Sequence, residues 1–248
     1  MAINDISFYG PNIFAKGTLT ESGTPDADRP VARLYDGAEC LYWGQSGTGL
    51  AIDIEVDQSG LATPYGVDVA VLAHHNLDAA TAAMLQYSDD GSTWTDLPGW
   101  TSPPAADRQS LALPATLTHA YWRLHITGAD NPVAGELFAG PRLALDGHIE
   151  PDGLQWADAA GALWRQTAGG AERSLQLSGR RRRRNYALRL VYAQLSALLD
   201  FAGDYAAAFY FQDHKQTIFM ARFDGHIRSR YVGGGEYLAE IALLEIIA

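Results

Sequence analysis

Two short Asp-His elements are the residues of this sequence that come closest to acid–base chemistry. The sequence reads DHK at 213–215 and DGH at 224–226. If neighbouring strands carried both elements, carboxylates and imidazoles would meet, and these groups serve general acid–base catalysis. Polar residues at the ends of a hairpin explain the same pattern. A hydrolase is therefore the weakest of three hypotheses, and we predict no catalytic residue.

Metal and nucleophile patterns are equally weak. His74 and His75 are adjacent, so in a strand their side chains point to opposite faces and cannot chelate one metal ion together. Cys40 has no histidine pattern nearby that would activate its thiol. The glycine clusters at 44–49 and 233–235 lack the Gly-Lys-Ser/Thr ending of a phosphate-binding loop. We expect no metal site, no cofactor and no enzymatic activity.

Five consecutive arginines form the densest charge in the chain: Arg180, Arg181, Arg182, Arg183 and Arg184. Guanidinium groups in such a run point in several directions, so no single carboxylate of the same chain satisfies them. Three interpretations are open: a solvated loop, a contact with nucleic acid, or a contact with the carboxylates of a neighbouring subunit. We favour the subunit interface, because arginine makes bidentate contacts with carboxylates and no aromatic side chains for base stacking are interleaved with the run.

Charge is divided unevenly along the 248 residues, whose formal net charge is −11. Residues 1–150 hold 6 Lys and Arg against 19 Asp and Glu, whereas residues 151–248 hold 12 against 10. An acidic first half repels nucleic acid and anionic membranes. One cysteine allows no intrachain disulfide, and no run approaches the roughly 18 apolar residues that a spanning helix needs. We expect no nucleic-acid partner, no signal peptide and no membrane insertion.

Short strands make up the first 145 residues. Apolar and polar residues alternate at 50–58, 67–74 and 121–127, which is the pattern of strands with one face in water. Asp-Asp-Gly at 89–91 separates two further apolar stretches and predicts a hairpin, because glycine tolerates the positive φ of tight turns. The pattern indicates a two-sheet β-sandwich, either a jelly roll or immunoglobulin-like.

The second half reads differently. Past residue 146, turn residues and small residues replace clean strands, which places a domain boundary near 146–150. Aromatic and branched residues then predict strands at 185–195, 207–213 and 217–225. A short helix fits 196–205 between the first two.

The C-terminal residues 237–248 alternate in polarity but contain helix-forming residues, and we favour a strand there over a helix. The predicted fold is all-β in two domains. Residues 1–147 form a jelly-roll β-sandwich, and residues 148–248 form a smaller β-rich domain with at most one or two short helices.

The first domain resembles a discoidin-type module, the galactose-binding-like jelly roll. The tripeptide HNL at 75–77 is especially similar to versions of this module in tail proteins of tailed bacteriophages. One departure is that Cys40 has no partner for the terminal disulfide of many secreted members. The segments that carry the resemblance are RLYDG at 33–37, YWGQSGTG at 42–49, LAIDIEV at 50–56, HNL, YSDDGSTWTDL at 87–97 and YWRLHI at 121–126.

This resemblance implies where a sugar would bind. Discoidin-type modules that bind sugars or lipids use loops at one end of the sandwich, and the matching positions here lie near Tyr42, Trp43, Tyr65 and Trp100. Trp100, between glycine and proline residues, is the best candidate for an exposed ring. Packing within the module or contact with a protein explains these aromatic residues as well.

The second domain resembles, more loosely, the small β-rich domains of phage distal-tail and baseplate proteins, which form rings around the tail tube. The resemblance rests on the spacing of segments 179–192, 208–225 and 231–246. The leading hypothesis is therefore a structural component of a bacteriophage tail tip or baseplate. It would be located in the virion tail after assembly in the host cytoplasm, with other tail proteins and copies of itself as partners. The alternative is a carbohydrate-binding module of the virion, or a stand-alone lectin-like protein, with host surface polysaccharide as its ligand.

Overall fold

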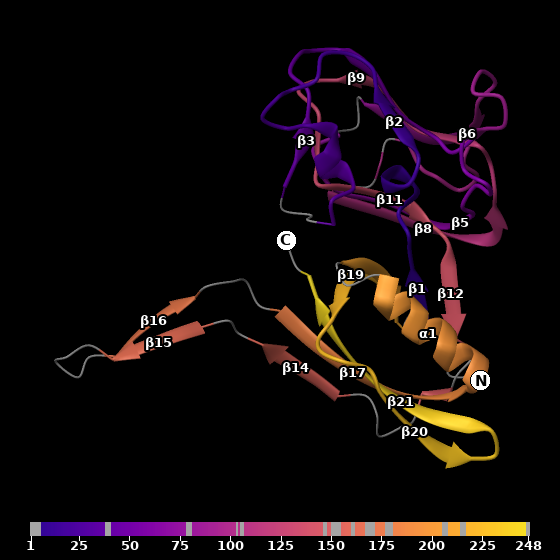
Figure 1. Cartoon of the computed structure of the whole chain (residues 1–248). Coiled ribbons are helices and arrows are strands. Elements are labelled where there is room, and N and C mark those ends of the chain that lie inside the picture. The colour runs from indigo at the N-terminus through magenta and orange to yellow at the C-terminus, as the bar shows by residue number, and fades with distance from the viewer. Residues whose placement is uncertain are drawn as a thin grey trace. The chain divides into compact units, whose positions relative to one another are not determined.

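A computed structural model describes the chain from Ile6 to Ile246, with gaps. The residues outside the description are 1–5, 38–40, 78–80, 103, 105–106, 146–147, 150–154, 160–161, 167–171, 177–180, 205–207, 214–216 and 247–248. The chain divides into two compact units (Figure 1). Tyr9–Arg142 form one, called here the sandwich unit. Met1–Phe8 and Leu143–Ala248 together form the other, called here the split unit.

Antiparallel strands in two main sheets build the sandwich unit. A five-stranded sheet has the order β2 (Thr18–Glu21), β4 (Leu50–Asp57), β9 (Tyr121–Ala129), β6 (Ala82–Ser88) and β7 (Thr95–Asp96). A three-stranded sheet has the order β11 (Glu136–Gly140), β5 (Val67–His75) and β8 (Asp107–Leu117). The smaller elements are the pair β3 (Trp43–Gly44) and β10 (Val133–Ala134) and the 3-10 turns η1 (Ile13–Ala15) and η2 (Val31–Leu34).

The core of the sandwich unit lies between the two main sheets and follows the alternation of the sequence. Ile54 of β4 and Leu124 of β9 are paired across the sheet and fully buried. The same holds for the pairs two positions away on either side, Ile52 with Ile126 and Val56 with Trp122. The predicted hairpin is confirmed between β6 and β7, with Gly91 at a φ of 68°. The all-β prediction with a jelly-roll sandwich is thus confirmed.

Connecting segments gather at one end of the sandwich unit. Strand register shows this, because Leu50 lies opposite Ala129 and Ala82 lies opposite Thr127. The starts of β4 and β6 and the end of β9 therefore lie at the same edge of the sheet. We define the loop end as the described residues of 22–49, 76–81, 98–106 and 130–135. Loops on a rigid sheet scaffold are the usual place for binding residues.

The chain enters and leaves the sandwich unit side by side. The Gly10 N–H donates to the Pro141 carbonyl at 3.1 Å. Strand β1 (Ile6–Tyr9) and strand β12 (Arg142–Leu145) are hydrogen-bonded neighbours in the sheet of the split unit. The sandwich unit is therefore an insertion between two adjacent strands of the split unit, a connection that domain insertions commonly use.

A nine-stranded sheet and one helix form most of the split unit (Figure 1). Its order is β12, β1, β18 (Phe209–Gln212), β19 (Ile218–Phe223), β21 (Glu236–Glu245), β17 (Arg181–Val191) and β13 (His148–Ile149), with β14 (Gln155–Ala159) beside β17 and β20 (Arg228–Gly233) beside β21. Strands β15 (Ala162–Gln166) and β16 (Glu172–Gln176) pair with each other. Helix α1 (Tyr192–Asp204) packs Leu195, Leu198 and Phe201 into the core.

The C-terminal strand is confirmed, since β21 pairs with β17 and β20 and buries Ala239, Ile241 and Leu243. Helix α1 is longer than the short helix predicted at 196–205 and begins inside the predicted strand 185–195, because strong helix formers follow Val191. Strands β14, β15 and β16 were not predicted from their small residues. No helix among the described residues is long and apolar enough to cross a bilayer.

The domain boundary predicted between residues 147 and 148 stays a prediction, and residues 146–147 lie outside the description.

The sequence pattern does not reveal where β1 lies in the fold. Its four residues, Ile6–Tyr9, are all buried, and Phe8 packs against Phe201, Phe209 and Phe211 of the split unit. Such a short strand carries no sign of a partner that follows so much later in the chain.

Candidate functional site

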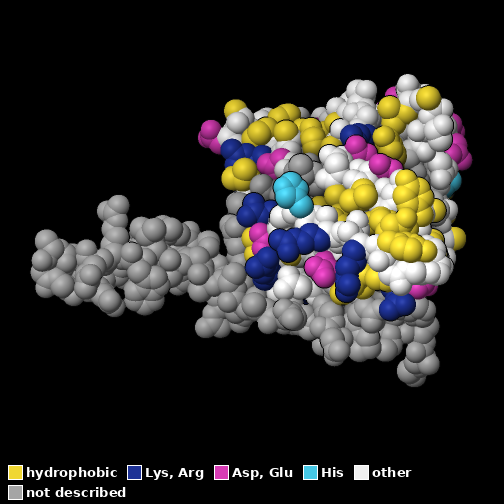
Figure 2. Space-filling model, turned by 60° about the horizontal axis from the view of Figure 1, so that its bottom comes forward, with side chains coloured by type: hydrophobic (Ala, Val, Ile, Leu, Met, Phe, Trp, Pro, Cys, Tyr) yellow, Lys and Arg dark blue, Asp and Glu magenta, His cyan; other side chains and the backbone are white. Residues whose placement is uncertain are grey.

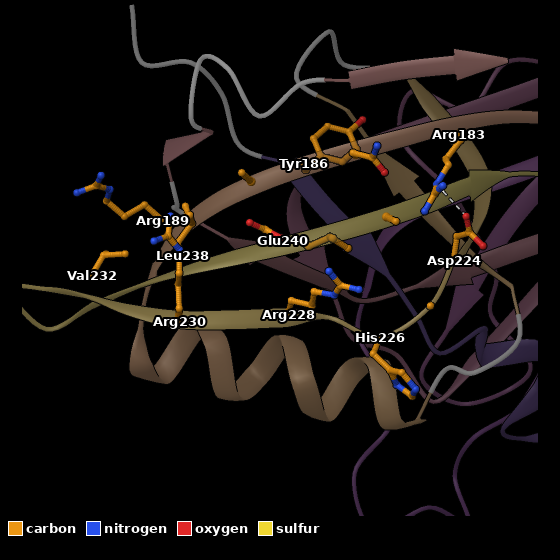
Figure 3. Close-up of a pocket in the computed structure, with 15 residues that line it drawn as sticks. Arg183, Tyr186, Arg189, Asp224, His226, Arg228, Arg230, Val232, Leu238 and Glu240 are labelled. Atoms are coloured by element: carbon orange, nitrogen blue, oxygen red, sulfur yellow. Dashed lines mark ion pairs between the residues drawn. The ribbon is translucent and has the colours of Figure 1, made fainter. Parts of the chain in front are cut away.

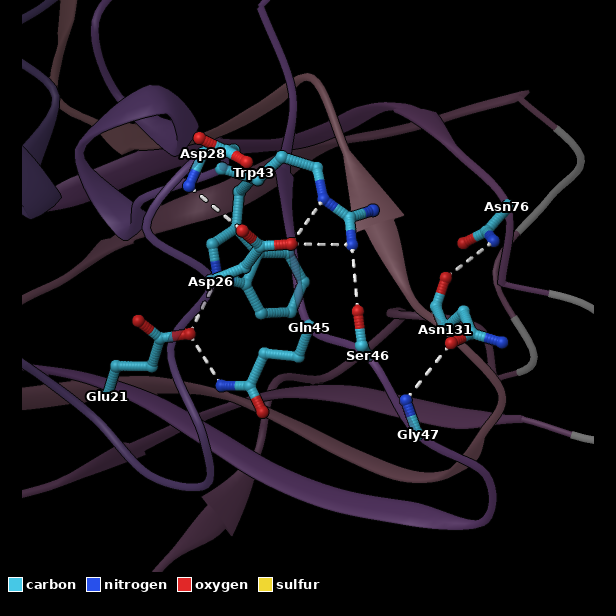
Figure 4. A network of polar contacts seen from close by, with 10 residues as sticks. Glu21, Asp26, Asp28, Trp43, Gln45, Ser46, Gly47, Asn76 and Asn131 are labelled. Atoms are coloured by element: carbon cyan, nitrogen blue, oxygen red, sulfur yellow. Dashed lines mark hydrogen bonds and ion pairs between the residues drawn. The ribbon is translucent and has the colours of Figure 1, made fainter.

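Two of the three aromatic residues expected to contact a glycan lie in the core of the sandwich unit. Trp43 is 1% exposed, and its Nε1–H donates to Glu21 at 2.7 Å (Figure 4). Trp100 is 6% exposed, and its Nε1–H donates to the Ala83 carbonyl at 3.1 Å. Neither ring is presented to a ligand. A large ring with one N–H donor is stabilised more by burial with a fixed acceptor than by exposure in a loop.

The third, Tyr65, lies at the other end of the unit. It belongs to the connection from β4 to β5, its ring packs against the core, and its backbone N–H donates to the Gln58 side chain at 3.0 Å. The structure therefore does not bring Trp43, Tyr65 and Trp100 together. The neighbouring Tyr42 is 40% exposed and lies at the loop end.

A group of polar side chains at the loop end surrounds Arg29. Its Nε and Nη2 contact one carboxylate oxygen of Asp26 at 2.9 and 2.8 Å, and Nη2 also donates to the Ser46 hydroxyl at 3.2 Å. The other Asp26 oxygen accepts from the backbone N–H of Asp28 at 2.9 Å. That hydrogen bond, followed by the one from Arg29, lowers the pKa of Asp26 below its ordinary value, because both favour the charged carboxylate.

Asparagine side chains fix the adjoining loops (Figure 4). The side-chain oxygen of Asn131 accepts a hydrogen bond from the Gly47 N–H at 3.0 Å. The side-chain amide of Asn76 donates to the backbone carbonyl of Asn131, also at 3.0 Å. Asn76 also accepts from Val133 N–H at 2.8 Å. We give the name polar loop cluster to the hydrogen-bonded Asp26, Arg29 and Ser46 together with the exposed Tyr42 of the same loop end. It contains a carboxylate acceptor, a guanidinium donor, a hydroxyl and an aromatic ring, and these groups are suited to recognise hydroxyl-bearing ligands.

The arginine run is only partly described, and the two residues whose side chains are described differ sharply. Arg184 is 4% exposed and donates to Asp213 at 2.7 Å and to Glu245 at 2.9 Å, with its guanidinium 4.0 Å from the centre of the Phe219 ring. Arg183 is about half exposed and pairs with Asp224 at 2.9 Å.

Both arginines thus find carboxylates in their own chain, which the sequence interpretation did not expect. The cause is strand β17, whose alternation turns Arg184 inward and Arg183 outward, toward carboxylates of neighbouring segments. Arg180 and the side chains of Arg181 and Arg182 lie outside the description, so an interface role for them stays a prediction.

An open cavity of about 880 Å³ lies on the outward face of β17, β20 and β21. Figure 2 shows basic side chains gathered on one face with acidic and hydrophobic ones beside them, and Figure 3 shows the cavity from close by. We call this cavity the arginine cradle. Its charged and ionisable lining consists of Arg183, Arg189, Arg228, Arg230, His226, Asp224 and Glu240.

The structure does not build the acid–base site considered from the sequence. Asp213 is 1% exposed, and its carboxylate is occupied by Arg184 and by the backbone N–H of Thr217. His226 lines the arginine cradle, and His214 lies outside the description. Within the described ranges, no three His, Cys, Asp or Glu residues are grouped so as to hold a metal ion.

Comparison of the sequence with protein-family models finds no match, and comparison with curated proteins finds none either. Among solved structures, the chain is similar to chitosan-binding module 1 of a chitosanase/glucanase from Paenibacillus sp. IK-5, with 21% identity and a TM-score of 0.43 over 53% of this chain and 100% of that one. Module 2 of that enzyme, in complex with chitotriose, gives 17% identity and a TM-score of 0.41 over 50% and 96%.

A third similar structure is CpGH89CBM32-6 from Clostridium perfringens, with 16% identity and a TM-score of 0.41 over 52% of this chain and 98% of that one. At this level of identity and score, the likeness decides neither the fold nor the ligand of this chain. The fold follows from the strands and registers described above.

Proposed function

We propose that this protein is a non-catalytic carbohydrate-binding protein and that the polar loop cluster contacts the sugar. One observation supports the proposal above others. Arg29 is held from two sides by Asp26 and Ser46 while its side chain remains 30% exposed. A polar group fixed before the ligand arrives loses little conformational freedom on binding, which favours affinity.

The chemistry of the cluster fits hydroxyl groups. The Asp26 carboxylate accepts hydrogen bonds from sugar hydroxyls, and the free N–H groups of Arg29 donate to sugar oxygens. The exposed ring of Tyr42 offers a face on which the C–H side of a sugar ring packs. None of these groups forms a nucleophile with an adjacent base, so the cluster supports binding without bond cleavage.

Binding to a glycan array followed by titration calorimetry tests the proposal. We expect Tyr42→Ala to weaken binding of the best glycan at least tenfold, because it removes the packing surface. Tyr231→Ala is the matched control, since Tyr231 is 62% exposed and belongs to the split unit. No binding to any glycan of a broad array at millimolar concentration would contradict the proposal.

The pH dependence of sugar binding provides a second test. Because the pKa of Asp26 lies below its ordinary value of 3.8, we expect affinity to stay constant from pH 7 to pH 4.5. Asp26→Asn removes the charge at every pH and should weaken binding throughout. A loss of affinity near pH 5 in the wild type would show that another group controls binding.

A second candidate is a structural component of a bacteriophage tail tip or baseplate that assembles with tail proteins and with copies of itself. The uneven charge supports it, because the acidic first half of one chain complements the arginine cradle of another. Changing Arg180, Arg181, Arg182 and Arg183 to Ser should leave the monomer folded and stop assembly, provided the buried Arg184 is kept. Light scattering measures the mass of the assemblies in solution. A variant that assembles to the same mass as the wild type would contradict this role.

A further inference from the structure

We propose that the arginine cradle of the split unit binds an acidic oligosaccharide, a chain of sugar units that carry carboxylate groups. This site is separate from the polar loop cluster and does not depend on it. Its residues come from the adjacent strands β17, β21 and β20 and from the turn before β20, and Figure 3 shows Arg228, Glu240 and Arg189 around the same open space.

Unbalanced positive charge in the cradle calls for an anion. Arg228 and Arg230 alternate along β20, so both side chains lie on the same side of the strand. Both are exposed, and neither makes an ion pair with any described residue. Arg183 and Arg189 line the same cavity but are already paired, with Asp224 at 2.9 Å and Glu236 at 3.3 Å. An arriving carboxylate therefore meets two guanidinium groups that hold no described carboxylate at ion-pair distance, with Glu240 opposite Arg228 in the strand register.

The size and the floor of the cradle fit a short sugar chain. Its volume of about 880 Å³ lies near the upper end of the roughly 300–1,000 Å³ of small-ligand sites. Small apolar residues of β17 and β21, Ala187, Leu238 and Ala242, lie among the polar groups. They offer contact for the C–H faces of sugar rings, and the amide of Asn185 supplies both a donor and an acceptor.

The carboxylates of the cradle favour an acidic sugar over nucleic acid. Asp224 and Glu240 would repel a continuous row of phosphates, whereas they accept hydrogen bonds from hydroxyl groups. The aromatic residue beside the cavity, Tyr186, turns its ring to the inward face and is 2% exposed, so it offers no platform for stacking bases. A neutral sugar would bring no counter-charge to Arg228 and Arg230. A ligand with many hydroxyls and spaced carboxylates satisfies all of these groups.

Calorimetric titration of the full-length chain with oligogalacturonate tests the proposal. We expect the double variant Arg228→Gln/Arg230→Gln to bind at least tenfold more weakly than the wild type. Arg222→Gln is the matched control, because Arg222 is an exposed arginine of β19 outside the cradle, and its binding should stay within twofold. Raising the salt concentration should weaken binding, since the contacts are between exposed charges.

Four outcomes would overturn the proposal. These are no binding of oligogalacturonate at millimolar concentration, unchanged binding by the double variant, tighter binding of polyglutamate, or tighter binding of a single-stranded oligonucleotide. The third would indicate an acidic protein as partner and the fourth nucleic acid. Tyr42→Ala should leave oligogalacturonate binding unchanged, so failure of this proposal is distinguishable from failure of the sugar site at the loop end.

Discussion

The two faces of strand β17 use the same residue type for different purposes. On the inward face Arg184 is enclosed by Asp213, Glu245 and the Phe219 ring, with its side chain 5% exposed. On the outward face the adjacent Arg183 is 46% exposed and has a single carboxylate partner. One step along a strand thus separates an arginine enclosed in the core from one that faces the arginine cradle.

The difference shows that the environment of a charge, and not its place in a run, decides its energetic role. A buried ion pair leaves an uncompensated charge when one partner is removed, which costs about 3–5 kcal/mol. An exposed pair contributes roughly 0–1 kcal/mol, because water solvates both groups when they separate. A run of arginines in sequence is therefore not one functional unit.

The largest expected effect comes from Arg184→Met. The change removes the buried guanidinium that pairs with both Asp213 and Glu245, and we expect the free energy of unfolding to fall by about 3–5 kcal/mol. Hydrogen exchange of the β17 and β21 amides measures this loss of stability locally. Arg183→Met is the matched control and should change exchange little. Equal protection in the two variants would contradict the contrast between the faces.

A smaller effect is expected from Tyr186, which lies on the inward face beside Arg184. Burial raises the pKa of Tyr186 from 10.0 to about 12, more than the neighbouring guanidinium lowers it. As pH rises, the unfolded chain loses its phenolic proton first, so the free energy of unfolding falls between about pH 10 and pH 12 by about 2–3 kcal/mol. Denaturation at several pH values measures this. In Tyr186→Phe this part of the alkaline loss should be absent, and an identical pH profile would refute it.

The smallest effect is expected from Asp224→Asn on the outward face. Both side chains of its ion pair with Arg183 are exposed to solvent, so the free energy of unfolding should change by less than about 1 kcal/mol. The change also releases Arg183 into the arginine cradle, and oligogalacturonate affinity should rise or stay constant. Denaturation and calorimetry measure the two quantities. A large loss of stability would mean that this face is structural as well.

Much of the sandwich unit could be predicted, because its strands carry a period of two. Trp122, Leu124 and Ile126 all point inward as their alternation indicates, and the Asp-Gly turn at 90–91 forms the expected hairpin. Periodicity reports which face is buried, and burial is the dominant favourable contribution to folding. It does not report which distant strand is the partner, so the pairing of β1 could not be read from the sequence.

The candidate sites were harder to predict for a related reason. Tryptophan in a loop gives the same local sequence whether its ring is exposed or buried, and the burial of Trp100 depends on the carbonyl of Ala83 in a distant strand. The partners of Arg184 are Asp213 and Glu245, which only the folded sheet brings near. The cradle residues on β20, Arg228 and Arg230, alternate in sequence and could have been singled out as a pair of exposed cations.

The insertion of the sandwich unit between β1 and β12 sets an order on biosynthesis. Strand β1 leaves the ribosome before the sandwich unit, yet its neighbours β12 and β18 are made only after that unit is almost complete or finished. The inserted module is one continuous segment and is therefore able to complete its folding while β1 still waits for its partner strands. Until translation reaches β12, the four buried residues of β1 have no strand partner, and one edge of β1 stays open until β18 is made, which makes it a natural target for a chaperone.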